Sequence, residues 1–88
     1  MKVRWSRRAL SDVAGIYAYI AADNAEAAAR MADRLLAAGE GLERFPQMGR
    51  PARLAGRREL VVDRHVLIYS ISRGEVHILA VEQGAQRK

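Results

Sequence analysis

The sequence contains no cysteine, which excludes disulfide bonds and any metal site built from thiolates. It also contains no apolar run close to the roughly 20 residues that a membrane-spanning helix needs. The first ten residues, MKVRWSRRAL, lack the apolar stretch of a secretory signal. We therefore expect a soluble cytoplasmic protein that has no membrane partner.

Proline and aromatic residues are scarce as well, but half of the 88 residues are hydrophobic and 28% are charged. This balance is typical of a folded globular protein rather than a disordered one. The length suffices for one modest hydrophobic core, and no repeat, low-complexity tract or linker divides the chain. The sequence therefore predicts a single domain over residues 1–88.

Positive charge is in excess, and the excess lies in one half of the chain. The net charge is +5. Residues 1–43 hold six basic and six acidic side chains, whereas residues 44–88 hold nine basic and four acidic ones. Within the second half, five arginines occur with no acid between them: Arg44, Arg50, Arg53, Arg57 and Arg58. Such a zone attracts polyanions or an acidic protein segment, and the alternative is a solvated surface that keeps the protein soluble.

Three short runs rich in Val, Ile, Leu and Tyr fill residues 57–81, and turn residues separate them at 63–64 and 72–74. Such runs predict antiparallel strands joined by hairpins. Because side chains alternate between the faces of a strand, Leu67, Tyr69 and Ile71 share one face. By the same rule, the third run puts Val76, Ile78 and Ala80 on one face and His77, Leu79 and Val81 on the other. Both faces are largely apolar, so we expect helices to cover one and a partner to cover the other.

The N-terminal half has the pattern of two helices after a short strand at 2–5. Ser6 is a suitable N-cap for the first helix, whose apolar residues recur at three- and four-residue steps: Ala9, Leu10, Val13, Ile16, Tyr17 and Ile20. Gly15 inside this helix indicates close packing of a neighbouring element, because an interior glycine costs about 1 kcal/mol relative to alanine. Tyr17 and Tyr19 cannot both face the core, so we expect one of them at the surface.

The second helix is expected to begin at an Asp23 N-cap, with Glu26 three positions on as in a capping box. Its apolar stripe comprises Ala28, Met31, Ala32, Leu35, Leu36 and Leu42, and Phe45-Pro46 ends it. The short link makes the two helices an antiparallel hairpin, and residues 46–56 are predicted to be a loop. The order strand, helix, helix and three strands predicts an α+β fold, with the hairpin packed on a mainly antiparallel sheet. The place of the first strand in that sheet stays open.

Several short motifs, taken in order, resemble one family. They are Ala9-x-x-Asp12-Val13-x-x-Ile16, Tyr19-Ile20, Phe45-Pro46-x-x-Gly49-Arg50-Pro51, Arg58-Glu59-Leu60-Val61-Val62, Val66-Leu67-Ile68-Tyr69-Ser70-Ile71 and Val76-x-Ile78-Leu79-x-Val81. Their order and spacing resemble the RelE/ParE superfamily of small bacterial toxins, and in particular its ParE-like branch. The resemblance spans nearly the whole chain.

The resemblance implies a type II toxin–antitoxin system, in which the toxin forms a hetero-oligomer with a cognate antitoxin, ParD-like or other. The antitoxin's C-terminal segment would wrap the toxin and provide the second cover of the sheet. DNA would be reached only through the antitoxin. ParE-like members of the family are associated with poisoning DNA gyrase, and RelE-like members with cutting mRNA on the ribosome.

RNA cleavage by a 2′-hydroxyl needs a base, an acid and a cation for the phosphate. RelE-like nucleases resemble one another in having a basic residue early in the third strand of the sheet and His, Arg or Tyr at the C-terminal end. At the corresponding positions this sequence has Val66, Gln83, Gln86 and Lys88, so catalysis is not supported. His65 and His77 are expected in structural or surface roles, with Glu75 the one carboxylate near His77. No metal motif or Gly-rich phosphate loop is present, and we expect no cofactor.

The candidate contacts with an antitoxin or a target are therefore basic side chains: Arg50, Arg53, Arg57, Arg58, Arg64, Arg87 and Lys88. For Arg58 alone we favour a pairing with Glu59 or a helix carboxylate that holds the loop down. Trp5 and Tyr69 are expected in the core.

Three functions are consistent with these residues. The first is a non-enzymatic toxin that binds a large target, with DNA gyrase as the candidate. The second is a ribosome-dependent mRNA endonuclease with unusual acid–base groups. The third is an inactive toxin-fold protein that binds only its antitoxin.

Overall fold

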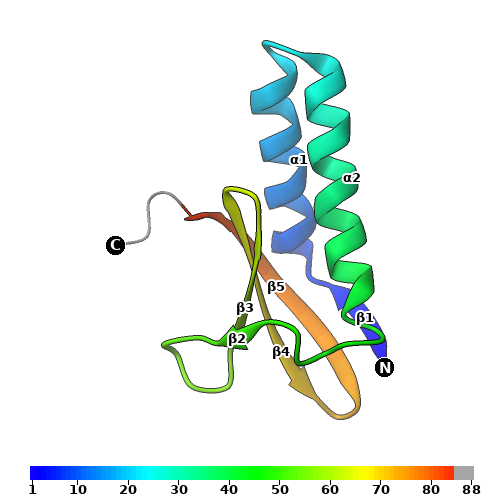
Figure 1. Cartoon of the computed structure of the whole chain (residues 1–88), viewed down its shortest axis with the longest axis vertical. Coiled ribbons are helices and arrows are strands. Elements are labelled where there is room, and N and C mark those ends of the chain that lie inside the picture. The colour runs from blue at the N-terminus through cyan, green and yellow to red at the C-terminus, as the bar shows by residue number, and fades with distance from the viewer. Residues whose placement is uncertain (85–88) are drawn as a thin grey trace.

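Two antiparallel helices lie against one face of a five-stranded sheet in the computed structural model, which describes residues 1–84 (Figure 1). The helices are α1 (Arg7–Ala21) and α2 (Ala25–Gly41). The strands are β1 (Lys2–Trp5), β2 (Arg50–Pro51), β3 (Arg58–Val62), β4 (His65–Ser72) and β5 (Glu75–Gln83). The linked ends of the helices reach beyond the sheet. This arrangement confirms the predicted α+β fold.

The sheet has the strand order β1-β5-β4-β3-β2, which places the first strand at one edge. β1 runs parallel to β5, and every other neighbouring pair in this sheet is antiparallel. The β4–β5 hairpin turns at Arg73 and Gly74, both of which have positive φ angles. This geometry is that of a tight two-residue hairpin, in which glycine is favoured. β2 lies inside the predicted loop and pairs over only two residues, too few to leave a periodic pattern in the sequence.

The two N-caps differ in how well the sequence predicted them. The Ser6 prediction is confirmed, because its side chain accepts a hydrogen bond from the Ala9 amide at 3.0 Å. The Asp23 prediction is wrong, because α2 begins after Asn24, whose side-chain oxygen accepts from the Ala27 amide at 3.0 Å. The backbone N–H of Asp23 instead donates to Ile20 at the end of α1. The N-cap of α2 therefore lies one residue later than predicted, at Asn24 instead of Asp23.

The core lies between the helices and the sheet and is formed by Ala9, Val13, Leu35, Leu42, Leu67, Tyr69, Val76, Ile78 and Val81. The prediction that Val81 lies on the face opposite Val76 and Ile78 is wrong. β4 pairs Ile68 with Ala80 but Tyr69 with Ile78, so Leu79 is an extra residue in β5. This β-bulge shifts the alternation by one position and turns Val81 toward the helices.

Close packing occurs at Gly39 in α2 and not at Gly15, where an added Cβ would meet open space. At Gly39 the same atom would overlap the ring of Trp5 and lie 2.8 Å from Ile78 Cδ1. The partly buried Trp5 ring therefore packs directly on the backbone of α2. Leu36, predicted in the apolar stripe, is 38% exposed. Tyr17 and Tyr19, in the second half of α1, are both exposed.

Candidate functional site

The segment that follows α2, residues 44–57, is held against the sheet by two side chains. We call this segment the basic loop, since it holds four arginines and no acid. The buried hydroxyl of Tyr69 donates to the Pro46 carbonyl at 2.7 Å and accepts from the Gly49 amide at 2.9 Å. Arg58 donates to the carbonyls of Gly49 at 3.0 Å and Gln47 at 3.3 Å. Arg58 thus fixes the loop through carbonyl groups instead of the expected carboxylate.

The other candidate arginines differ in their partners. Arg50 lies 3.5 Å from the buried Glu59 carboxylate, while its own side chain stays 74% exposed. Within residues 1–84, Arg53, Arg57 and Arg64 form no ion pair or side-chain hydrogen bond. Their guanidinium groups are therefore available to a partner. The last two candidates, Arg87 and Lys88, lie outside the described residues.

A groove of about 410 Å³ lies beside the basic loop. Its apolar lining includes Ile68, Leu79 and Ala80, and Arg8, Arg53 and Arg57 contribute the positive charge. Ile68 of β4 pairs with Ala80 of β5. Each lies next in sequence to a residue that faces the helices, Leu67 and Val81 respectively. Because adjacent residues in a strand point to opposite faces, this groove lies on the face away from the helices. We call it the sheet-face groove; Glu59 and Glu82 also line it.

A second hollow, of about 400 Å³, lies at the β3–β4 turn and is lined in part by Arg50, Val61, Arg64 and His65. Nδ1 of His65 is buried and has no hydrogen-bond partner among residues 1–84. Burial lowers the pKa of His65 below 6.5, and the nearby Asp63 carboxylate opposes that shift. His65 is therefore neutral near pH 7. It stands at the start of β4 and lines the hollow.

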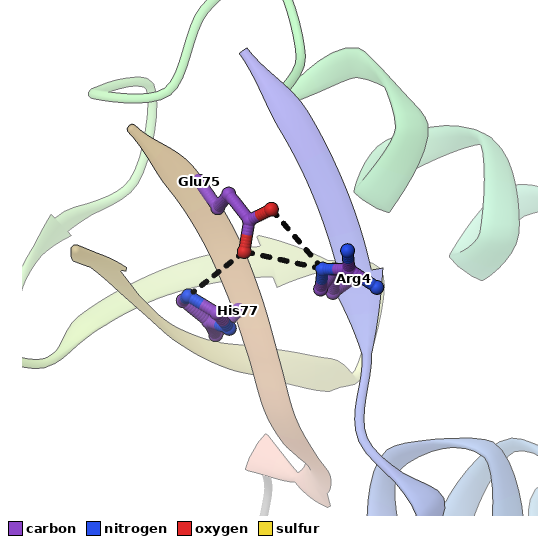
Figure 2. Close-up of polar contacts among 3 residues, drawn as sticks. All are labelled: Arg4, Glu75 and His77. Carbon is purple, nitrogen blue, oxygen red and sulfur yellow. Dashed lines mark hydrogen bonds and ion pairs between the residues drawn. The ribbon is translucent and has the colours of Figure 1, made fainter. Parts of the chain in front are cut away.

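The other histidine belongs to a polar cluster of three side chains on β1 and β5 (Figure 2). Nε of Arg4 lies 3.1 Å from both oxygens of the Glu75 carboxylate. One of these oxygens lies 3.6 Å from Nε2 of His77. Ser70 is the cross-strand partner of His77, but no hydrogen bond joins their side chains among the described contacts. The cluster therefore links β1 to β5. Among the described residues, His77 forms no hydrogen bond with a hydroxyl group that could act as a nucleophile. Sequence reasoning missed Arg4, since the parallel pairing of β1 was not predictable.

The positions compared with RelE-like nucleases carry no acid or base in the described part of the chain. Val66 is buried, and its Cγ2 packs close to Gly84. Gln83 is exposed and pairs with His65 at the end of β5. Gln86 and Lys88 lie outside the described residues. Among residues 1–84 there is also no group of three metal-ligating side chains, and no helix is long and apolar enough to cross a membrane.

The helical hairpin on a sheet of this order matches the fold of solved RelE and ParE toxins. Residues 3–87 match the family described as "ParE toxin of type II toxin-antitoxin system, parDE", and the chain belongs to that family. It is 40% identical to the Sinorhizobium fredii protein named "Putative toxin Y4kP", over 98% of this chain and 91% of that protein. It is 38% identical to "Toxin RelE2" of Caulobacter vibrioides, over 97% of each chain.

A solved structure with the same fold is the chromosomal ParDE system of P. aeruginosa. It has a TM-score of 0.84 at 23% identity, over 94% of this chain and 95% of that one. The toxin–antitoxin complex RelBE2 of Mycobacterium tuberculosis has a TM-score of 0.72 at 23% identity, over 93% and 95% of the two chains. At this level of identity the two structures support the fold alone. The family match over residues 3–87 makes the chain a ParE-family toxin of the type II toxin–antitoxin class.

Proposed function

We propose that the whole chain, residues 1–88, is one toxin domain that acts in the cytoplasm and poisons DNA gyrase by binding it. A cognate antitoxin neutralises it in a toxin–antitoxin hetero-oligomer. The observation that carries this proposal is the family match over residues 3–87, whose description names the parDE system. The structural neighbours are described as a ParDE toxin–antitoxin system and a RelBE2 toxin–antitoxin complex, which further supports an antitoxin partner.

The sheet-face groove is the surface where we place the antitoxin. Its apolar lining, including Ile68 and Leu79, accommodates the apolar side of an amphipathic segment. Arg53 and Arg57 supply cations for the carboxylates on the other side of that segment. Arg50 and Arg64, on the neighbouring hollow, extend the same basic rim. Arg58 acts indirectly by holding the loop, and Arg87 and Lys88 are expected to add charge.

Charge reversal tests this placement. Arg53→Glu with Arg57→Glu should weaken binding of the antitoxin that co-purifies from the native operon, and the loss should shrink as salt is raised. Arg50 is left unchanged, because its reversal would also disrupt the ion pair with Glu59. The matched control is Arg7→Glu with Arg30→Glu, which makes the same charge change at exposed positions on the helices. Equal affinities for the two double variants at every salt concentration would exclude the sheet-face groove as the antitoxin site.

The target is tested by expressing the chain without antitoxin. A gyrase poison should induce the DNA damage response and filamentous growth, and the purified chain should block supercoiling by purified gyrase. The target proposal is physically reasonable because a binding mechanism needs no acid–base pair at Val66 or Gln83. A normal supercoiling rate with excess folded toxin would contradict it.

The relative named "Toxin RelE2" favours a second candidate, a ribosome-dependent mRNA endonuclease. In that case expression without antitoxin should stop translation at once and produce cut transcripts. If neither response occurs and growth is normal, the third alternative holds, and the chain binds only its antitoxin. These three outcomes are mutually distinguishable in one induction experiment.

A further inference from the structure

The basic loop combines positive charge with exposed apolar side chains in an unusual way. Arg44, Arg50, Arg53 and Arg57 are distributed along its length, with no acid between them. Phe45, Met48 and Leu54 lie among these arginines, and each is more than half exposed. The guanidinium carbon of Arg44 lies 6.0 Å from the centre of the Phe45 ring. The surface therefore offers cations and an aromatic face together.

The loop is also held in one shape before any partner binds. Tyr69 and Arg58 fix its first part through Pro46, Gln47 and Gly49. Its second part closes on itself, because the Ala52 amide donates to the Arg57 carbonyl at 2.9 Å. A surface that is already ordered loses little conformational entropy on binding. Figure 1 shows the segment running from the end of α2 across to β2 and then out into solvent.

We infer that the basic loop binds single-stranded nucleic acid directly, with its arginines on the phosphates and an unpaired base stacked on Phe45. Arginine suits phosphate because its planar guanidinium donates in pairs. An exposed aromatic ring gives a base a stacking platform without sequence preference. This contact goes beyond the proposed function, in which DNA is reached only through the antitoxin.

An acidic protein segment is the competing partner, and the arrangement of the loop favours nucleic acid. An amphipathic segment needs its apolar contacts gathered in one groove, as in the sheet-face groove. Leu54 lines that groove, but Phe45 and Met48 lie outside it. Arginines precede and follow these two side chains in the sequence, as phosphates flank the bases of a single strand. DNA and RNA present the same phosphates and stacking bases, so either strand fits this chemistry.

The test measures fluorescence anisotropy of labelled 12-nucleotide DNA and RNA strands with the purified chain over a range of salt. We expect binding of at least one strand, stronger than binding of the same sequence as a duplex. Replacing Arg53 and Arg57 by Gln should weaken binding and reduce the slope of log affinity against log salt by about 1.4, or about 0.7 for each phosphate contact of a single strand. The control with Arg7→Gln and Arg30→Gln has the same net charge and should keep most of the slope.

Phe45→Leu separates stacking from charge, since leucine keeps the apolar contact but has no ring. It should weaken single-strand binding by about 5- to 150-fold and leave duplex binding unchanged. Circular dichroism checks that every variant is folded.

Four results would overturn the inference: no binding of either strand at 50 mM salt, equal losses in the two double arginine variants, no effect of Phe45→Leu, or tighter binding of a labelled polyglutamate peptide. The last would assign the loop to an acidic protein. Arg53 and Arg57 also line the proposed antitoxin site, so Phe45→Leu separates the two proposals: Phe45 lies outside the sheet-face groove, and its replacement should leave antitoxin binding unchanged.

Discussion

Asp12 on α1 accepts a hydrogen bond at 2.9 Å from the backbone amide of Val81, which lies 69 residues later in β5. This hydrogen bond lies beside the β-bulge, where the extra residue Leu79 interrupts the pairing of β4 with β5. The Leu79 carbonyl at the same bulge accepts from the Ser6 hydroxyl at 2.9 Å. The start of α1 therefore supplies the hydrogen bonds that the irregular strand requires.

Asp12→Ala should lower the free energy of unfolding by about 1–3 kcal/mol, because it leaves the Val81 amide without its acceptor in a partly buried position. Asp12→Asn keeps an acceptor oxygen of the same size and should recover most of that loss. Urea unfolding of the three proteins measures both values. If Asp12→Asn is as unstable as Asp12→Ala, the carboxylate charge matters more than the hydrogen bond, with the exposed Arg8 at 3.5 Å as its partner.

Gly39→Ala and Gly15→Ala should have opposite effects on stability. Replacing an interior helical glycine by alanine normally stabilises by about 0.5–1 kcal/mol, and Gly15 has the space to gain it. At Gly39 the new methyl group would overlap Trp5, and overpacking typically costs about 1–3 kcal/mol. Thermal unfolding of both variants is the measurement. A stabilised Gly39→Ala protein would mean that Trp5 moves aside at little cost.

Tyr69→Phe should loosen the basic loop more than it disturbs the core. The ring volume is kept, but the Gly49 amide and the Pro46 carbonyl each lose their hydrogen-bond partner. We expect a loss of about 1–3 kcal/mol in the free energy of unfolding and faster hydrogen exchange at the Gly49 amide. Amides in the middle of β5 serve as the internal control. Unchanged exchange at Gly49 would show that Arg58 alone is enough to hold the loop.

Stability should fall on mild acidification because of His65. Its pKa is lower in the folded protein than the ordinary value of 6.5, so the unfolded chain takes up its proton at a higher pH. The His65 contribution is therefore constant above pH 6.5, and stability is lost as the pH falls from 6.5 through the folded-state pKa. His65→Gln should remove this part of the pH dependence in urea unfolding between about pH 7 and pH 5. An unchanged pH profile in the variant would assign the effect to other groups.

The double variant His65→Ala and His77→Ala should remain toxic when expressed without antitoxin. The reason is that neither side chain is placed for acid–base chemistry: His65 has an unpartnered buried nitrogen, and His77 lies against Glu75. Growth inhibition is compared with that of the parent, with circular dichroism to check folding. Loss of toxicity in a folded double variant would support the nuclease alternative.

Local features of the fold could be predicted from the sequence where one short pattern determines them. Ser6, the helical periodicity after it and the turn at Arg73-Gly74 are of this kind. The bulge at Leu79 could not be predicted, because it depends on side chains of α1 that are distant in the sequence. The same is true of Gly39, whose role depends on Trp5 from another element.

The candidate site shows the same division. The concentration of arginines in residues 44–58 was visible in the sequence, and the structure brings several of them to one side of the sheet. The sequence could not distinguish Arg58, which holds the loop, from Arg53 and Arg57, whose guanidinium groups remain available to a partner. That distinction depends on which carbonyl groups come within reach after the chain has folded.

The parallel pairing of β1 with β5 joins Lys2 to Glu75 and Trp5 to Ile78. β1 therefore has no neighbour in the sheet until β5, which lies about 70 residues later in the chain, is in place. Such long-range pairing is slow to form, because the chain loses the entropy of closing a long loop before the contact rewards it. A translation product that stops before residue 75 lacks the strand between β1 and β4. Premature termination would thus yield a polypeptide without the central ladder instead of a shortened active toxin.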